Sequence, residues 1–529
     1  MTVDLVVLVL SSVVLALPFA LLHHVNTIDG PAHVAGATLI GQERNLAVVR
    51  RYFRISYTPV PNLVTPLALS ALMTVVSPTW AEKLLVIGYI VAFPLAVRFA
   101  ILSVSPRAGW LSLLSLPFVV NYMLLFGFYD FCWAMVGAMV AIGVALRARG
   151  RWKARHVVTL AVVLVLTYAT HLVPAVMAVG VILALALTEA LSWRGRGDPG
   201  GRRRGAAAAL LPPTLAVLSA VGLVAWYLQS GDGGGSAIVR KSLTSLVGGL
   251  ATLTLPIVSY SPLEIVGALL TCALLLVLVA AAWRAVRRST ISPLTWRLTV
   301  VTAACTAVYF LAPDQVGTGS FLNDRLSLFP PLVLLLALAS VVHHGRVLRL
   351  TGVAAAAVAL GMAGARLPTQ VRYDRLVDEY LSAAPAIPRG ATLVALRYHV
   401  FSPPLGDQRY KQQDPLDNEA NRLAAQRDAV DLRSLEAEVG YFLESFRPPV
   451  EGPIAADLNN FAVPPPVHLA AYDHSARHVD YVLIVGLRQA SAAVRHAPAT
   501  EAVERELARH YVEVYATKPT GLVAVYRYR

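Results

Sequence analysis

The sequence predicts a polytopic α-helical membrane protein that carries a C-terminal α/β domain outside the membrane. Of its 529 residues, 56% are hydrophobic and 14% are charged, whereas a soluble globular domain has about 25% charged residues. Apolar stretches of span length recur up to residue 365, and short arginine-rich loops separate many of them. Beyond residue 365 the chain is polar, and no apolar run there is long enough to cross a membrane.

The basic loops set the expected topology, because an excess of Arg and Lys marks cytoplasmic loops. The net charge is +14, which in a soluble protein would suggest nucleic-acid binding. Here the basic residues cluster beside apolar stretches, so we expect no nucleic-acid partner. The clusters are Arg147–Arg155, Arg194–Arg204, Arg284–Arg297 and His343–Arg349. The preference for Arg over Lys is typical of a GC-rich bacterial genome, and the expected location is a bacterial plasma membrane.

Hydropathy and loop charge together predict about 11 transmembrane helices within residues 1–365. Each span moves the chain to the other side of the membrane. If Asn62–Val76 were also a span, the count from a cytoplasmic N-terminus would place the cluster Arg147–Arg155 outside, against the charge rule. That stretch is short and interrupted by prolines, so it is predicted to lie in the interface. The expected spans are Leu5–Leu22, Leu84–Val104, Trp110–Val120, Phe131–Leu146, His156–Leu172, Pro174–Leu191, Ala206–Leu228, Leu263–Trp283, Leu298–Ala312, Leu326–Val342 and Thr351–Ala365.

Residues 366–529 are predicted to form one extracytoplasmic α/β domain. Short runs rich in β-branched and aromatic residues predict strands, and amphipathic periodicity predicts helices. The expected strands are Ala391–Leu396, Tyr481–Val485, Tyr511–Tyr515 and Leu522–Tyr528, and the expected helices are Asn418–Phe446 and Glu501–His510.

With this topology, several ionisable residues fall on the outer side of the membrane, where such groups indicate a functional site. Asp29 and His33 stand one helical turn apart, so both side chains are expected on one face. They are candidates for catalysis or for binding a divalent cation, Mg²⁺, Mn²⁺ or Ca²⁺. Ordinary N-capping by Asp29 is an equal alternative. Asp130, which opens a span, is a second candidate carboxylate for catalysis or the cation, with the same alternative.

Five other outer residues are candidates for substrate binding. Tyr168 and His171 close a hairpin, where an interfacial role is the alternative. Arg325 precedes a span and could hold a phosphate through its planar guanidinium, or extend to lipid headgroups. Arg240 and Lys241 lie in a long outer loop, where an anionic ligand and a solvated loop are equally expected.

These residues, in this order, resemble the GT-C superfamily of membrane glycosyltransferases, the group of the protein mannosyltransferases, aminoarabinose transferases and arabinosyltransferases. The similar features are an acid after the first span (Asp29), an aromatic Gly-Phe turn (Phe126-Gly127-Phe128), a Tyr-x-x-His (Tyr168 to His171) and an Asp-Arg pair (Asp324-Arg325). Gly30 stands where many members carry a second acid, which puts strict metal dependence in doubt.

The resemblance implies transfer of a hexosyl or pentosyl unit from a polyprenyl-phosphate donor to an extracytoplasmic glycan, lipid or protein. It implies Asp29 as the base and Arg325 or a metal as the partner of the phosphate. Two other classes stay open from the residues: a transporter or flippase for lipid-linked glycans, and a non-enzymatic protein of cell-envelope assembly. The sequence contains no P-loop, Rossmann glycine pattern, HExxH or GxSxG motif.

Overall fold

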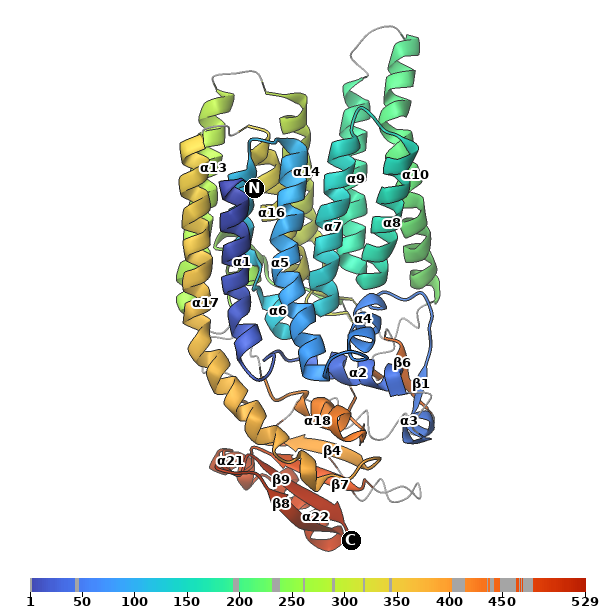
Figure 1. The fold of residues 1–529 in the computed structure, drawn as a ribbon, viewed down its shortest axis with the longest axis vertical. Coiled ribbons are helices and arrows are strands. Elements are labelled where there is room, and N and C mark those ends of the chain that lie inside the picture. Colours follow the sequence, from blue (N-terminus) through green and yellow to red (C-terminus); the bar gives the residue numbers. More distant parts are fainter. Residues whose placement is uncertain are drawn as a thin grey trace. The chain divides into compact units, whose positions relative to one another are not determined.

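The computed structural model divides the chain into two compact units (Figure 1). Unit 1 comprises Met1–Pro18 and Val86–Leu367, and unit 2 comprises Phe19–Leu85 and Pro368–Arg529. The structure describes residues 2–42, 47–193, 199–230, 238–259, 262–287, 291–316, 319–341, 345–401, 414–434, 436–437, 442–447, 463–465, 467, 469 and 479–529.

Unit 1 is a bundle of long apolar helices, three of which continue into unit 2. Its elements are α1 (Val3–Leu21), α5 (Pro78–Val104), η1 (Gly109–Phe118), α6 (Tyr122–Phe126), α7 (Tyr129–Ala148), α8 (Ala154–Thr170), α9 (Leu172–Ser192), α10 (Pro199–Ser230), β2 (Ile238–Val239), α11 (Leu243–Ala251), α12 (Thr254–Ile257), α13 (Leu263–Val286), α14 (Pro293–Leu311), β3 (Gln315–Val316), α15 (Leu322–Leu326), α16 (Phe329–Ala339) and α17 (Gly345–Leu381). Helices α1, α5 and α17 are those that continue into unit 2.

The predicted spans are confirmed as helices. In the described part of the chain, 10 helical segments are long and apolar enough to cross a membrane, and Ala154–Thr170 is a shorter apolar helix. Each coincides with one predicted span, so the chain is a multi-pass membrane protein. The stretch expected to lie in the interface forms only the nine-residue helix α4 (Val64–Leu72). Parts of three basic loops, including Arg194 and His343, lie outside the described residues.

Unit 2 is built around a five-stranded mixed sheet with the strand order β5-β4-β7-β9-β8. Strands β5 and β4 and strands β4 and β7 pair in parallel, while β7, β9 and β8 are antiparallel neighbours. The elements of unit 2 besides the helix ends are α2 (Gly30–Gln42), α3 (Ala47–Tyr52), β1 (Phe53–Ile55), α4, η2 (Ala384–Ala386), β4 (Thr392–Arg397), α18 (Glu419–Arg427), β5 (Val430–Asp431), β6 (Glu444–Phe446), β7 (Tyr481–Val485), α21 (Ala492–Arg495), α22 (Pro498–His510), β8 (Tyr511–Ala516) and β9 (Val523–Tyr528).

Both faces of the sheet are covered, which explains why its central strands are almost uniformly apolar. On one face Val394 and Ile484 pack in a cluster with Leu507 of α22. On the other face Leu393 and Leu483 pack with side chains from α17 and α18. The four predicted strands and the C-terminal helix of this region are confirmed.

The predicted helix Asn418–Phe446 is confirmed over Glu419–Arg427 and is wrong where the chain forms the strands β5 and β6. Helix α18 ends at Arg427, because Asp428 adopts a left-handed conformation with φ of 48°. The chain then forms β5, which extends the sheet, and β6, which pairs antiparallel with β1. Sheet pairing with distant segments overrides the local helical pattern here. The predicted division at residues 365 and 366 stays a prediction about domains, while unit 2 as found also contains Phe19–Leu85.

Candidate functional site

Asp29 lies at the start of α2 in unit 2, and its side chain is half-buried. Its carbonyl oxygen accepts the first intrahelical hydrogen bond, from the amide of His33, so it holds the N-cap position that the sequence allows. The side-chain amide of Asn418 donates to the Asp29 Oδ1 at 3.1 Å and to the carbonyl of Ile28 at 3.1 Å. Asn418 therefore orients the side chain of Asp29, a residue that is partly exposed.

His33, one turn along α2, is buried and forms an ion pair through Nδ1 with Glu436. Glu436 is in turn hydrogen-bonded to Glu444 in β6, and both carboxyls are buried. Burial and the neighbouring Glu436 raise the pKa of Glu444 well above its usual range. An imidazole and two carboxyls therefore lie together in the interior, where burial favours the neutral form of Glu444.

Gly36 provides the space for this carboxyl pair. A Cβ at this position would collide with carboxylate oxygens of both Glu436 and Glu444. Both oxygens belong to groups buried against α2, so they have no room to retreat. The close approach of the helix backbone thus requires glycine here.

Gly36→Ala is expected to lower the stability of the protein by about 1–3 kcal/mol, because it overpacks a filled interior. The matched control is Gly361→Ala in α17, where an added Cβ meets nothing within 4 Å and helix propensity favours alanine. Thermal unfolding of both variants in detergent should shift in opposite directions. A downward shift of equal size in both would contradict the role assigned to Gly36.

Arg422 of α18 organises a second buried charge cluster. Its guanidinium donates to Glu82 at 2.8 Å, to Glu419 at 3.0 Å and to the carbonyl of Val25 at 3.2 Å. Burial raises the pKa of Glu419 to about 7, which Arg422 partly opposes. This cluster joins α18 to the segment that leads to Asp29.

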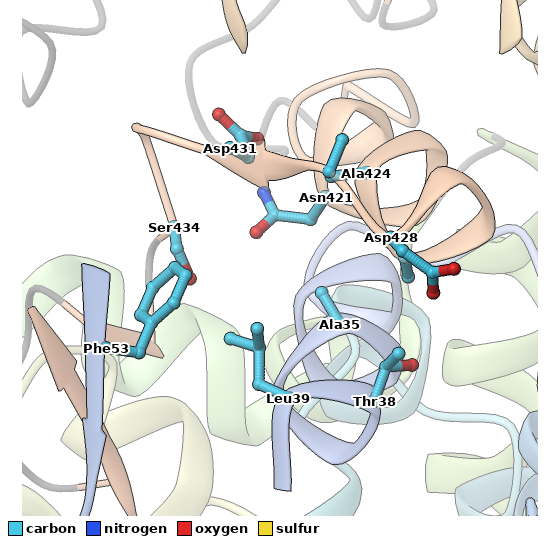
Figure 2. A pocket seen from close by; sticks show the side chains of 11 residues that line it. Ala35, Thr38, Leu39, Phe53, Asn421, Ala424, Asp428, Asp431 and Ser434 are labelled. Carbon is cyan, nitrogen blue, oxygen red and sulfur yellow. The ribbon is translucent and has the colours of Figure 1, made fainter. Parts of the chain in front are cut away.

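A small, open pocket lies beside α2 and α18 (Figure 2). Phe53 and Leu39 give it an apolar side, and Asn421 and Asp431 contribute buried polar groups. Within the described part of the chain, Asn421 Oδ1 and Asp431 Oδ2 have no hydrogen-bond partner. Burial raises the pKa of Asp431 to about 6.

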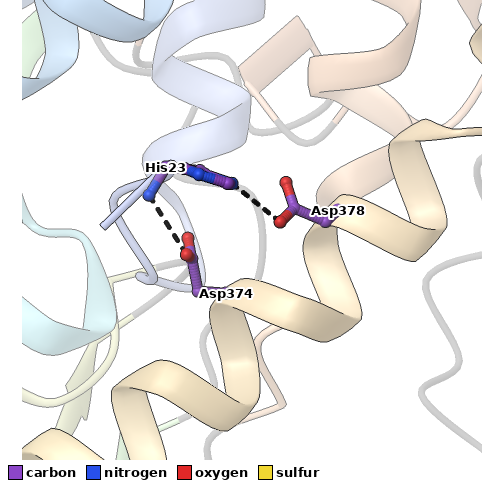
Figure 3. A group of neighbouring side chains, drawn as sticks. All are labelled: His23, Asp374 and Asp378. Atoms are coloured by element: carbon purple, nitrogen blue, oxygen red, sulfur yellow. Dashed lines mark hydrogen bonds and ion pairs between the residues drawn. The ribbon is translucent and has the colours of Figure 1, made fainter. Parts of the chain in front are cut away.

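Histidine and aspartate side chains also gather where α1 leads into the Asp29 segment (Figure 3). Among the residues that the structure describes, His23, Asp374 and Asp378 form the one group of three such side chains close enough to hold a metal ion. The group contains none of the residues expected to bind a cation, Asp29, His33 and Asp130. A cation at those three residues therefore stays a prediction.

In unit 1, Asp130 and Phe131 lie in the first turn of α7, and both side chains are buried. Asp130 is the second residue of the helix and not its N-cap, which is Phe128. The ring of Phe131 meets the ring of His171 edge-on, with 5.6 Å between centroids. His171 itself caps α9, since its Nδ1 accepts from the amide of Val173 at 3.1 Å. Tyr168, one turn earlier, is also buried.

Arg325 in α15 lies near the same group. Its guanidinium stacks over the ring of Phe128 at 4.6 Å from the centroid. Burial lowers the pKa of His171 well below its usual range, and the charge of Arg325 acts in the same direction. His171 is therefore neutral beside a cation, and Phe126 and Phe321 complete an aromatic surface with Phe128.

The two basic residues of the long loop are engaged by unit 1 itself. Lys241 forms ion pairs with Asp324 and, at 3.1 Å, with Asp314. Arg240 donates to the carbonyl of Leu311 at 2.9 Å. Pairing of β2 with β3 brings this loop beside Asp314. An anionic ligand at Arg240 and Lys241 stays a prediction.

Sequence reasoning missed Glu436, Glu444, Asn418 and Arg422, the partners that unit 2 supplies around α2. One signal could have identified some of them. Charged residues such as Glu419, Arg422 and Glu444 stand within segments that were predicted to form a helix. Asn418 pairs with Asp29, and Arg422 pairs with Glu82, across more than 300 residues of the chain, and no local pattern encodes such a pairing.

The solved structures that are similar to this chain include one of a membrane transferase. It is the crystal structure of ArnT from Cupriavidus metallidurans bound to undecaprenyl phosphate, and the match covers 99% of this chain and 97% of that chain. The two share 10% sequence identity, with a TM-score of 0.48. No family model matches the chain, and no curated protein matches it.

Proposed function

We propose that this protein is an integral-membrane glycosyltransferase, which moves a sugar from a polyprenyl-phosphate donor to an extracytoplasmic acceptor. The observation that carries the proposal is the exposure of Asp29 and its hydrogen bond with Asn418. Asp29 stands in the position of the acid on which the resemblance to the GT-C superfamily rests.

Asp29 is the proposed general base for the acceptor hydroxyl. A carboxylate that acts on an incoming hydroxyl must be accessible and held in one orientation. Asn418 supplies the orientation through one carboxylate oxygen. His33, Glu436 and Glu444 anchor the helix that begins directly after Asp29, and so they act as positioning residues in this proposal.

Arg325 is the proposed partner of the donor phosphate. Sugar transfer leaves negative charge on the departing phosphate, which a fixed cation stabilises. The guanidinium is stacked on Phe128 and next to a neutral histidine, His171, so no neighbouring imidazolium competes for an anion. The aromatic side chains Phe126 and Phe321 offer an apolar surface suited to a polyprenyl chain.

The test is transfer of label from a panel of radiolabelled polyprenyl-phosphate sugars in membranes that contain the wild type, Asp29→Ala or Asp29→Asn. Loss of the base is expected to slow transfer by about 10²–10⁴-fold in both variants. Asparagine retains an oxygen that can accept from Asn418, so Asp29→Asn separates loss of the base from loss of the local fold.

The control is Glu501→Gln on the exposed surface of α22, which should transfer label at the wild-type rate. Equal transfer by wild type and both Asp29 variants would contradict the proposed base. Absence of transfer from every donor would favour transport of lipid-linked glycans or a structural role in the cell envelope.

A further inference from the structure

We propose that His23, Asp374 and Asp378, with His24 beside them, form a binding site for a divalent transition-metal ion of the Zn²⁺ type. The site lies entirely within unit 2. It is distinct from the cation expected at Asp29, and it fastens the chain segment that leads to Asp29 onto helix α17. The proposal is independent of which reaction the protein catalyses.

The four side chains converge from two elements. Asp374 and Asp378 are four residues apart in α17 and so share one face of that helix. Asp378 contacts both imidazoles, His23 Nδ1 at 2.8 Å and His24 Nε2 at 3.0 Å. Figure 3 shows His23 between the two aspartates. Asp378 contacts its ring, and Asp374 accepts a hydrogen bond from its backbone amide.

The separations suit a metal ion of this class. The ligand atoms of His23, Asp374 and Asp378 lie within 4.8 Å of one another. Zn²⁺ binds imidazole nitrogen and carboxylate oxygen at about 2.0–2.2 Å, so neighbouring ligand atoms in a tetrahedral site are about 3.3 Å apart. The observed N···O distances of 2.8 and 3.0 Å would have to increase by only a few tenths of an ångström.

The ligand set selects among ions. An imidazole with two carboxylates favours Zn²⁺ and related transition metals, whereas Mg²⁺ and Ca²⁺ prefer oxygen ligands alone. The backbone amides of His23 and His24 donate to the two oxygens of Asp374 at 3.1 and 2.8 Å. Such hydrogen bonds orient a ligating carboxylate, as is usual around protein-bound metals.

An ion can reach the site from solvent, because the side chains of His23 and Asp378 are 72% and 42% exposed. The nearby cations do not occupy it. Lys83 donates to the carbonyls of Ala20 and Leu22, and Arg422 is held by Glu82 and Glu419. The two aspartates therefore offer anionic ligands of the kind that a divalent ion requires.

The experiment uses the full-length protein in detergent after treatment with a chelator, with Co²⁺ as the spectroscopic probe. One Co²⁺ per chain should bind with the visible absorption of a tetrahedral site, and Zn²⁺ should displace it. Zn²⁺ should also raise the midpoint of thermal unfolding. His23→Ala and Asp378→Asn should each weaken binding by at least about tenfold.

His23→Ala removes an exposed side chain, so this variant should fold even if Asp378→Asn does not. The control is His496→Ala, which alters a histidine next to α21 and should bind Co²⁺ as the wild type does. Co²⁺ spectra that match the free ion would overturn the proposal, as would equal binding by the wild type and His23→Ala. None of these measurements depends on sugar transfer.

Discussion

Replacing Arg422 with methionine is expected to destabilise the protein by about 3–5 kcal/mol, the usual cost of removing one member of a buried ion network. The Arg422 side chain is 2% exposed and is bonded to two carboxylates, Glu82 and Glu419, both fully buried. Methionine keeps much of the volume but leaves both acids without their cation. The carbonyl of Val25 also loses its donor.

Thermal and denaturant unfolding of the purified protein in detergent would measure this effect. The matched control is Arg505→Met in α22, whose guanidinium is 63% exposed and 3.8 Å from Glu501. An exposed pair of this kind contributes less than about 1 kcal/mol, so the control should unfold near the wild-type midpoint. Equal midpoints for the two variants would contradict the assignment.

A second arm separates loss of charge pairing from loss of packing. Adding Glu82→Gln and Glu419→Gln to Arg422→Met removes the stranded charges, so the triple variant should recover part of the lost stability. If packing alone were responsible, the triple variant would be no more stable than Arg422→Met.

The membrane part of the fold could be predicted from the sequence because its signal is local. A span needs only length and apolar composition, and both are visible in the chain itself. The proline-rich stretch before α5 shows the value of loop charge, since Arg147–Arg155 could be cytoplasmic only if that stretch did not cross. The structure has a helix of nine residues there, too short to span.

The strands of unit 2 could be predicted in part, but their pairing could not, because it depends on contacts between distant parts of the chain. Strands such as β7 are apolar on both faces and were recognisable. The pairing of β1 with β6 joins residues nearly 400 positions apart, and it places Glu444 beside α2. The sequence singled out His33 but offered nothing that would identify Glu436 as its partner.

The candidate residues of unit 1 show the same limit. His171 and Arg325 were predicted to bind substrate, and the structure brings them near one another with Phe128 and Phe131. The charge of Lys241 in a predicted outer loop suggests that it binds an anionic ligand. That charge is paired with Asp314 and Asp324, a contact that depends on the short β2–β3 pairing and that the sequence does not reveal.

The stability of the protein is expected to fall as the pH rises from about 5 to about 7.5. Burial raises the pKa of Glu419 to about 7 and that of Asp431 to about 6, and it raises the pKa of Glu444 well above its usual value. Each carboxyl therefore binds its proton more tightly in the folded chain than in the unfolded chain, where carboxyl pKa values are near 4.

The sign follows from proton linkage. The folded state binds more protons than the unfolded state between these pKa values, so the stabilisation is fully present below about pH 4 and is lost as the pH rises through the folded values. Glu419 alone accounts for a change on the order of 3 kcal/mol. Burial lowers the pKa of His24, so His24 alone would make the stability rise with pH below about pH 6.5. The three carboxyls change the stability in the opposite direction, and their combined effect is expected to be larger.

The measurement is the midpoint of thermal unfolding in detergent at pH 5.0, 6.0 and 7.5, for the wild type, Glu444→Gln and the surface control Glu501→Gln. Glutamine imitates the protonated Glu444, which donates to Glu436, and it cannot ionise. The Glu444→Gln curve should therefore be flatter than the other two, with its largest gain over the wild type at pH 7.5. A wild-type midpoint that rises with pH across this range would mean that these carboxyls are ionised in the folded protein. The buried contact of Glu419 with its cationic partner Arg422 would then dominate the pH dependence.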